Sequence, residues 1–416
     1  MSNTIRILLG LLAGAVAGLL LAWLDPGLAA RAVAFAQPIG RLWLNALQMT
    51  VVPLVLALVV VGVSAANDAA ASGRIARRAI VVFALLLSAG AVFAAIVDPL
   101  LLALLPRDPA AIEKLRAAIP AGGGAPAAVG FGDWFAGVIP VNAIAAAAQS
   151  AMLPLVVFAL FFGFALTRIE AARRERMIEF FQAIADTMIV IVRWVLWAAP
   201  LGVFALIFAV CAHAGAGVLS ALGGYIAMQC VTYAAMTLLL YPVAIAFGGE
   251  APRRWVAGLL PPQVVAASTQ SSLASLPAML ESARDRLGHP RAVSALVLPM
   301  AVSLFRLTSP MQYIGAASFV AWIHGVDVPL AQLAIATALA VVLSLGAVGL
   351  PGQVSFMAAT MPVTSTMGLP VEPLGLLLAV DTIPDVFATV GNVSADLAAS
   401  SIVARAEART RQRPAG

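Results

Sequence analysis

Charged residues are scarce in this sequence. Only 10% of its 416 residues are Asp, Glu, Lys or Arg, while 62% are hydrophobic. A soluble globular domain carries about 25% charged residues, so the composition excludes an ordinary soluble protein. The net charge of +5 does not indicate nucleic-acid binding, because the basic residues stand in short gaps between apolar runs. The composition therefore predicts a polytopic membrane protein.

Cysteine, histidine and lysine are also rare. Cys211 and Cys230 lie in or near apolar segments, which implies buried thiols and no disulfide framework. The three histidines fall in predicted gaps without metal-ligand spacing, and Lys114 is the only lysine. The sequence contains no nucleophile–base pair, zinc spacing or phosphate loop. We therefore expect no enzyme activity, no metal site and no cofactor.

The apolar runs predict eight membrane-spanning segments. The first three cover residues 5–24, 38–64 and the stretch up to 104; the others cover 134–167, interrupted near Pro140 and Pro154, then 177–211, 217–247, 292–322 and 371–404.

Basic residues in the gaps predict which side each gap faces. The arginine-rich gaps at 74–78 and 168–176 are predicted to be cytoplasmic, and those at 25–37, 105–133 and 212–216 external. Both termini are then cytoplasmic. We expect a multi-pass protein of the cell membrane, which is the inner membrane in a Gram-negative cell.

Two further apolar segments start and end on the same side of the membrane. Residues 255–283 lie between basic flanks, with a polar tip at Gln270–Ser275. Residues 330–369 have no basic flank and a tip at Gly346–Gly352. Non-helical backbone at membrane depth is tolerated only where it is buried or lines a cavity. Oppositely inserted hairpins are typical of inverted repeats that bind substrate near the midplane.

The last span carries a polar stripe, and the seventh is broken at residues 305–310 (FRLTSP). Each acidic group at a bilayer centre costs roughly 2.5–3.5 kcal/mol, so the stripe must face protein or a watery cavity. The stripe is therefore a candidate functional site. Its first residue, Asp381, is expected instead to link this span to another one. The stripe, which shares one helix face, consists of Asp381, Asp385, Thr389, Asn392 and Asp396.

Four motifs resemble those of the dicarboxylate/amino acid:cation symporter family, which has the glutamate-transporter-like fold. They are QSSLASLP at 270–277, LPMAVSLFRLTS at 298–309, GAVGLPG at 346–352 and DTIPDVFATVGNVSAD at 381–396. Residues 138–163 are also similar to the family's fourth span, so the resemblance covers nearly the whole chain. It implies an all-α polytopic membrane protein with eight transmembrane helices plus two oppositely oriented re-entrant hairpins. It also implies inverted repeats, a homotrimer, and an elevator-type motion gated outside by the second hairpin.

The resemblance divides the chain into scaffold and transport parts. Residues 1–74 would hold scaffold helices 1 and 2, and residues 134–215 scaffold helices 4 and 5. Residues 75–133 would hold transport-domain helix 3 and an external loop. Residues 216–416 would complete the transport domain with helix 6, the first hairpin, helix 7, the second hairpin and helix 8.

The family's pattern also implies roles for individual residues. Asp385 would hold a substrate amino group, Thr389 and Asn392 would contact substrate, and Asp396 would bind a cation together with Asn392. Other predicted substrate contacts lie at the two hairpin tips and at the break in the seventh span. These are Ser271, Ser272, Arg306, Thr308, Leu350, Pro351 and Gly352.

The chain departs from the family's pattern where that pattern binds carboxylate and sodium. Ala388 stands where the family has a basic residue, and Gln270 where some members have an arginine. The family's Asn-Met-Asp-Gly-Thr motif is replaced by residues 305–309 (FRLTS). Ala84 and Leu87 stand where polar groups complete one sodium site. The substrate binding and sodium binding that are usual in the family therefore cannot be assumed for this chain.

Arg306 has two interpretations that the sequence leaves open. Its guanidinium could bind a substrate carboxylate, or it could pair with Asp385 or Asp396 and replace a bound cation. We predict a symporter of small carboxylate solutes, such as dicarboxylates or amino acids, with sodium or protons as coupling ion. The alternatives are an uncoupled facilitator or exchanger, and a non-transporting membrane sensor. The expected partners are the solute, the lipid bilayer and two further copies, without nucleic acid.

Overall fold

Helices form all the regular structure in the part of the chain that is described. The computed structural model describes residues 3–71, 73–105, 113, 136–215, 217–346 and 352–412. Within these ranges no strand occurs, and six stretches of helix are long and apolar enough to cross a membrane. The predicted fold class, an all-α polytopic membrane protein, is confirmed.

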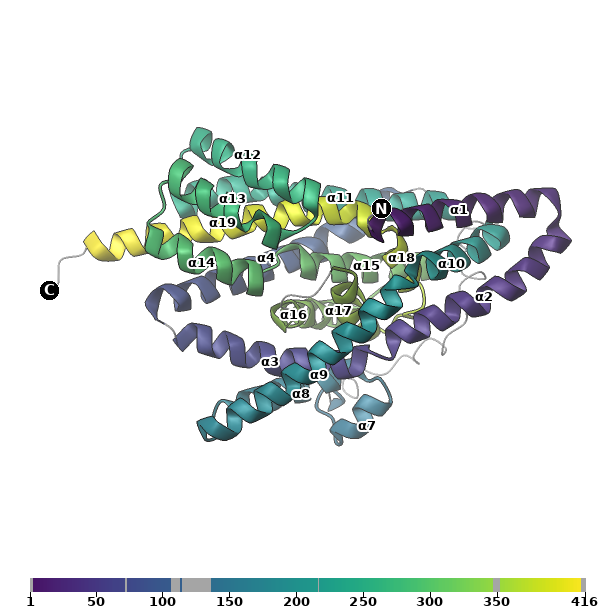
Figure 1. Cartoon of the computed structure of the whole chain (residues 1–416), viewed down its shortest axis with the longest axis horizontal. Helices are drawn as coiled ribbons and strands as arrows, with labels where there is room; N and C mark the ends of the chain where they lie inside the picture. Colours follow the sequence, from purple (N-terminus) through teal and green to yellow (C-terminus); the bar gives the residue numbers. More distant parts are fainter. Residues whose placement is uncertain are drawn as a thin grey trace.

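The first half of the chain forms two groups of packed helices. Helix α10 packs against α1 and α2, and α3 packs against α8 and α9 (Figure 1). The helices of this half are α1 Asn3–Leu24, α2 Pro26–Gln48, α3 Val51–Ala71, α4 Arg74–Leu104, α7 Ala143–Ala148, α8 Met152–Leu166, α9 Ala171–Trp197 and α10 Ala199–Ala214.

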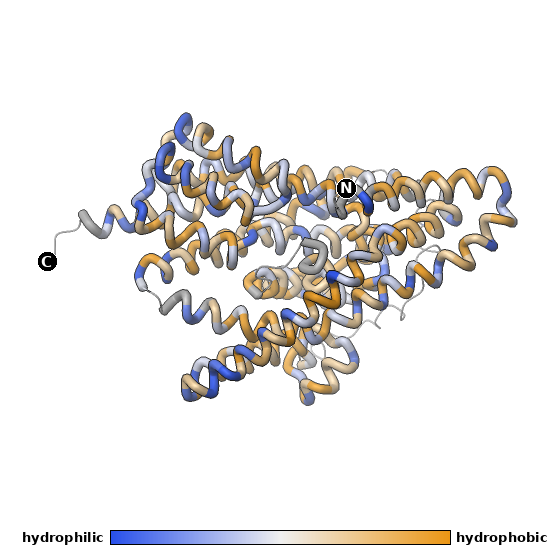
Figure 2. Tube along the Cα trace, viewed as in Figure 1, coloured by the Kyte–Doolittle hydropathy of each residue, from blue (hydrophilic) through white to orange (hydrophobic). Residues whose placement is uncertain are grey.

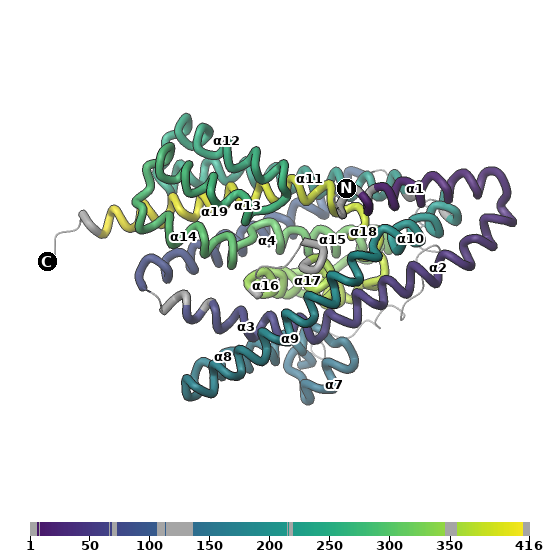
Figure 3. Tube along the Cα trace, in the orientation of Figure 1, coloured from purple at the N-terminus to yellow at the C-terminus, as the bar shows by residue number. Residues whose placement is uncertain are grey.

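The second half is arranged around α19, the last helix. Helix α19 packs against α4, α11, α12 and α14, so its length is covered by segments distant in sequence (Figure 3). The elements of this half are α11 Gly217–Val243, η1 Ala244–Gly248, α12 Pro252–Thr269, α13 Ser272–Glu281, η2 Ser282–Arg286, α14 Arg291–Leu304, α15 Thr308–His324, α16 Leu330–Gly346, α17 Gly352–Thr366, α18 Leu374–Val380 and α19 Thr382–Gln412.

Three glycines let α1 approach α10 closely. Gly10, Gly14 and Gly18 stand four residues apart and therefore share one helix face. A Cβ atom added to any of them would lie 2.5 or 2.6 Å from a backbone oxygen of α10. Small residues at this spacing allow helices to pack backbone to backbone in a membrane. The contact between α1 and α10 thus depends on these glycines.

The structure corrects the predicted start of the second span. Residues 25–37 are predicted to be an external gap, but α2 already begins at Pro26. The Asp25 carboxylate caps this helix by accepting a hydrogen bond from the Leu28 N–H at 3.0 Å. Proline suits the first turn, where its missing N–H would have had no partner. Asp25, one of the residues that suggested a loop, is the cap of this helix.

Two other predicted boundaries differ from the structure. The interruption expected near Pro154 lies at Ser150, whose φ of 53° is left-handed. Pro154 itself lies in the first turn of α8, where proline is tolerated. The predicted fifth span, residues 177–211, is divided between α9 and α10, which meet at Ala198. Hydropathy cannot detect such a division, because both helices are apolar.

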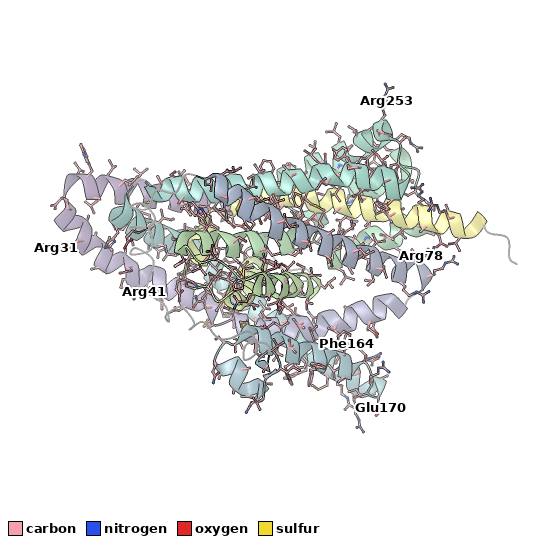
Figure 4. All side chains as sticks on the ribbon, turned by 180° about the vertical axis from the view of Figure 1, so that it is seen from behind. Arg31, Arg41, Arg78, Phe164, Glu170 and Arg253 are labelled. Atoms are coloured by element: carbon pink, nitrogen blue, oxygen red, sulfur yellow. The ribbon has the colours of Figure 1, made fainter. Side chains whose placement is uncertain are left out.

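Many of the hydrophilic residues lie toward the two ends of the molecule, while the middle is mostly apolar (Figure 2). Arg78 and Arg253 lie at one end together with Glu170, and Arg31 lies at the other (Figure 4). The first three come from gaps predicted to be cytoplasmic, and Arg31 comes from one predicted to be external. Gaps predicted to lie on opposite sides of the membrane therefore lie at opposite ends of the molecule. Which end faces the cytoplasm stays a prediction.

An ionic contact joins the start of α4 to the end of α19. Glu407 is 3% exposed and accepts hydrogen bonds from Arg74 and, at 2.9 Å, from Arg78. Arg78 also donates to the Ala406 carbonyl and the Thr410 hydroxyl. One buried carboxylate therefore links two helices that are far apart in sequence.

We expect Glu407→Gln to lower the free energy of unfolding by about 2 kcal/mol, because both guanidinium groups lose their charged partner. Denaturant-dependent loss of helical signal in detergent measures this change. Glu175→Gln is the matched control, because Glu175 is exposed on α9. An unfolding midpoint equal to that of the control would mean that the contact does not stabilise the protein.

Candidate functional site

Two helix breaks and the tip of the first hairpin meet at α19. Helix α14 ends at Leu304 and α15 begins at Thr308, while Asp381 separates α18 from α19. At the tip, Gln270 has a left-handed φ of 51°. Its side-chain N–H₂ donates to the Thr382 carbonyl at 3.1 Å. The hairpin tip is therefore attached to the second break.

Thr308 and Asn392, which are both predicted site residues, are in direct contact. The side-chain amide oxygen of Asn392 accepts hydrogen bonds from the Thr308 backbone N–H at 2.9 Å and from the Thr308 hydroxyl at 3.0 Å. The same hydroxyl lies 3.2 Å from the Ala388 carbonyl. Gly391 allows α15 to approach α19 this closely, because a Cβ atom at this position would lie only 2.9 Å from the Thr308 methyl group. These contacts fix the start of α15 against α19, and direct substrate contact by either residue stays a prediction.

Asp381 forms the link to another span that its position suggests. Both of its carboxylate oxygens accept from the Gln312 side-chain N–H₂, at 2.8 and 2.9 Å. Gln312 lies on α15, and both side chains are buried. The break between α18 and α19 is therefore also tied to α15. Sequence reasoning did not identify Gln312, because nothing local marks it as the partner.

The rest of the polar stripe becomes more buried toward the C-terminus. Asp385 is half-buried, whereas Thr389 and Asp396 are buried. The Thr389 hydroxyl donates to the Asp385 backbone carbonyl at 2.8 Å. Neither carboxylate oxygen of Asp396 has a hydrogen-bond partner among the described residues. An ionised carboxyl buried in this way needs a positive charge nearby.

Arg306 supplies positive charge to this region. It lies in the break between α14 and α15 and is half-buried. Its guanidinium interacts electrostatically with the carboxyl groups of three stripe residues, namely Asp381, Asp385 and Asp396. The structure thus brings Arg306 to the stripe, as both of its interpretations require.

The hairpin tips are described in part. The Ser271 hydroxyl caps α13 by accepting from the Ala274 N–H at 3.2 Å, and the Ser275 hydroxyl donates to the Ser271 carbonyl. Ser272 begins α13 and is half-buried. In the second hairpin Gly352 begins α17. The predicted contacts Leu350 and Pro351 lie outside the described residues.

Two buried polar groups were missed at the sequence level. Asp98 is an acidic residue inside the apolar helix α4, and this feature alone marks a candidate functional residue in a membrane protein. His289, assigned to a gap, is buried: its ring nitrogens lie 2.9 Å from Glu250 and 3.1 Å from the Ser400 hydroxyl. No local pattern in the sequence predicts the histidine cluster, because its members come from separate segments.

Comparison of the sequence with known proteins finds similar transporters. The chain matches the model of the sodium:dicarboxylate symporter family over residues 4–406. It is 27% identical over 381 residues to a proton/glutamate-aspartate symporter of Escherichia coli K12, covering 89% of this chain and 85% of that protein. It is 30% identical over 420 residues to the neutral amino acid transporter B(0) of Oryctolagus cuniculus, covering 92% and 76%.

A proton/sodium-glutamate symport protein of Geobacillus stearothermophilus is 26% identical over 410 residues, covering 97% of this chain and 94% of that protein. The family consists of transporters rather than enzymes. The matched region includes both helix breaks, the first hairpin and the polar stripe of α19. The chain belongs to the sodium:dicarboxylate symporter family.

Proposed function

We propose that this protein is a cation-coupled symporter of small carboxylate-bearing solutes, and of amino acids in particular. The observation that carries the proposal is the position of Arg306, half-buried in a helix break beside the polar stripe of α19. A guanidinium binds a carboxylate through two parallel hydrogen bonds. The similar transporters are named for glutamate, aspartate and neutral amino acids, which all carry an α-carboxylate.

The charges of the site favour a zwitterion. Arg306 would hold the solute carboxylate, and the half-buried Asp385 would hold its ammonium group. A second carboxylate on the solute would be repelled by Asp385 or Asp381. Ala388 provides no basic group on α19 that could bind it. This charge pattern supports amino acids over plain dicarboxylates. Thr389, Asn392 and the tip serines would complete the contacts with hydrogen-bonding groups.

Asp396 supports coupling to a cation. Both of its oxygens lack a hydrogen-bond partner among the described residues, so they are available to a bound cation or proton. Uncoupled exchange is the second candidate, because the charge of Arg306 acts on Asp396 and could take the place of such a cation. The two candidates predict opposite responses to an imposed ion gradient.

The packing is compatible with a scaffold and a transport part. Helices α1, α2, α3, α8, α9 and α10 pack mainly among themselves, whereas α4 packs against α11, α15 and α19. This grouping supports the division at residues 75, 134 and 216 as a proposal. The homotrimer and the elevator motion are proposed on the family resemblance.

Uptake into proteoliposomes tests the function. Purified protein would be supplied with labelled neutral amino acids, acidic amino acids and C4-dicarboxylates, under imposed sodium or proton gradients. We expect amino acids to accumulate above the level of protein-free liposomes when one of the gradients is directed inward. Exchange that no gradient accelerates would establish the uncoupled alternative. No flux of any solute through folded protein would support the sensor alternative.

A further inference from the structure

A second buried polar site lies away from the stripe, between α4, α11 and α15. Asp98 of α4 and Gln229 of α11 are both 0% exposed. Measured from the point where a Cβ atom on Gly315 would stand, the Gln229 amide oxygen lies at 2.3 Å and the Asp98 Oδ2 atom at 2.9 Å. Both oxygens therefore point into the same small space above a glycine. Neither has a hydrogen-bond partner among the described residues.

The other polar atoms of the two side chains are already engaged. The Thr232 hydroxyl donates to Asp98 Oδ1, and the Gln229 N–H₂ donates to the Tyr233 hydroxyl at 3.1 Å. What remains is a carboxyl oxygen facing an amide oxygen, and both are acceptors unless one carries a hydrogen. Two oxygens are too few for a metal cation, whereas a single proton needs no more than these two.

We propose that Asp98 and Gln229 form a proton-binding site, in which the protonated Asp98 carboxyl donates a hydrogen bond to the Gln229 amide oxygen. When the proton leaves, the amide can turn, so that its N–H₂ donates to Asp98 and its oxygen accepts from the Tyr233 hydroxyl. The pair can thus satisfy both protonation states at a buried position. This inference rests on the proposed symport function and assigns a coupling ion to it.

Among the described residues, no neighbouring basic group would hold Asp98 ionised. On α11 it faces the phenols of Tyr225 and Tyr233. Helix α16 carries no charged residue, and α15 carries none before His324. The ionic contact of Arg74 and Arg78 is about 30 Å away along α4. Binding a proton is the direct way to neutralise a carboxyl in such a place.

A cavity of about 320 Å³ lies next to the site, between the last turns of α4 and α15. Its lining includes Pro99, the residue after Asp98, and Ser318, one turn beyond Gly315. It also includes Asp327 in the segment after α15, which is predicted to be external. Asp98 and Gln229 do not line the cavity, so a proton would still have to pass from the cavity to the carboxyl.

The proton site is also connected to the solute site. Gln312, which holds Asp381 at the second helix break, lies on α15 one turn before Gly315. Asp381 and Asp98 both interact electrostatically with Tyr225 and Tyr233. A change in the charge of Asp98 would therefore act close to the break that flanks the stripe. This short connection is what coupling of proton and solute requires.

Transport and infrared spectroscopy together test the proposal. Asp98→Asn copies the shape and the hydrogen bonds of the protonated carboxyl, so the variant should fold. With the membrane potential clamped, an inward gradient of one pH unit should raise solute accumulation about tenfold in the wild type if one proton is carried. Asp98→Asn should lose this increase. Gly315→Ala should lose it too, because its methyl group would occupy the space between the two oxygens.

Asp186→Asn is the matched control, because Asp186 is a carboxyl on the apolar helix α9 that is exposed and remote from the site. It should keep the tenfold increase. Proton-driven accumulation that persists in Asp98→Asn would overturn the proposal. Infrared difference spectra of wild type against Asp98→Asn should contain the carbonyl band of a protonated carboxylic acid, and its absence at every pH would also overturn it. If the band is present but the wild type transports no solute, Asp98 binds a proton as proposed, and the proposed symport function is wrong.

Discussion

Replacing Arg306 with alanine is expected to reduce solute uptake at least about a hundredfold. A hydrogen bond to a charged group contributes about 1.5–3 kcal/mol, and each 1.4 kcal/mol is a tenfold change in affinity. A bidentate guanidinium–carboxylate contact therefore accounts for about two orders of magnitude. Initial uptake rates in proteoliposomes at low solute concentration measure the loss. Arg193→Ala, which removes an exposed arginine from α9, should retain wild-type uptake.

Arg306→Lys separates the two interpretations of this residue. Lysine keeps the charge but loses the planar fork, so a bidentate carboxylate contact would be weakened while a simple charge balance with Asp385 or Asp396 would be kept. We expect uptake by Arg306→Lys to fall at least tenfold. Wild-type uptake in Arg306→Lys, together with a new sodium dependence in Arg306→Ala, would show instead that the guanidinium replaces a bound cation.

The sequence was sufficient to place the first helix break and the tip of the first hairpin. Pro310 with its polar neighbours indicated the break that the structure has before Thr308, and the serine-rich stretch indicated the tip at Gln270. Such breaks are local, because they follow from residues that interrupt the helix or cannot remain in lipid. The four stripe residues on α19 were equally visible, because helical spacing alone puts them on one face. The fifth, Asp381, lies in the break before α19, which the sequence did not predict.

The partners of these residues could not be predicted in the same way. Gln312 binds Asp381 and Thr308 binds Asn392 because of how α15 is rotated and placed against α19. That placement depends on packing along the whole length of both helices, which a single sequence does not specify. Asp98 is different: its acidic side chain in an apolar helix was visible, and only its partner on α11 was hidden.

The contact between Thr308 and Asn392 is the second position where a single change should have a large effect. Asn392→Leu removes the oxygen that accepts both the Thr308 N–H and its hydroxyl. The N–H would be left buried without a partner, which costs about 1–3 kcal/mol. Because Arg306 lies two residues before Thr308, a shift at the start of α15 would also move the guanidinium. We expect uptake to fall at least tenfold and the free energy of unfolding to drop by about 2 kcal/mol.

Two variants of Thr308 show whether positioning is the cause. Thr308→Ser keeps both donors and should resemble the wild type, whereas Thr308→Val keeps the N–H bond and should lose less stability than Asn392→Leu. Unfolding in detergent and uptake in proteoliposomes would be measured for all three variants. Uptake lost in Asn392→Leu at unchanged stability would mean that Asn392 acts on the solute itself. Normal uptake in Asn392→Leu would remove this pair from the transport mechanism, because the break would then hold its position without it.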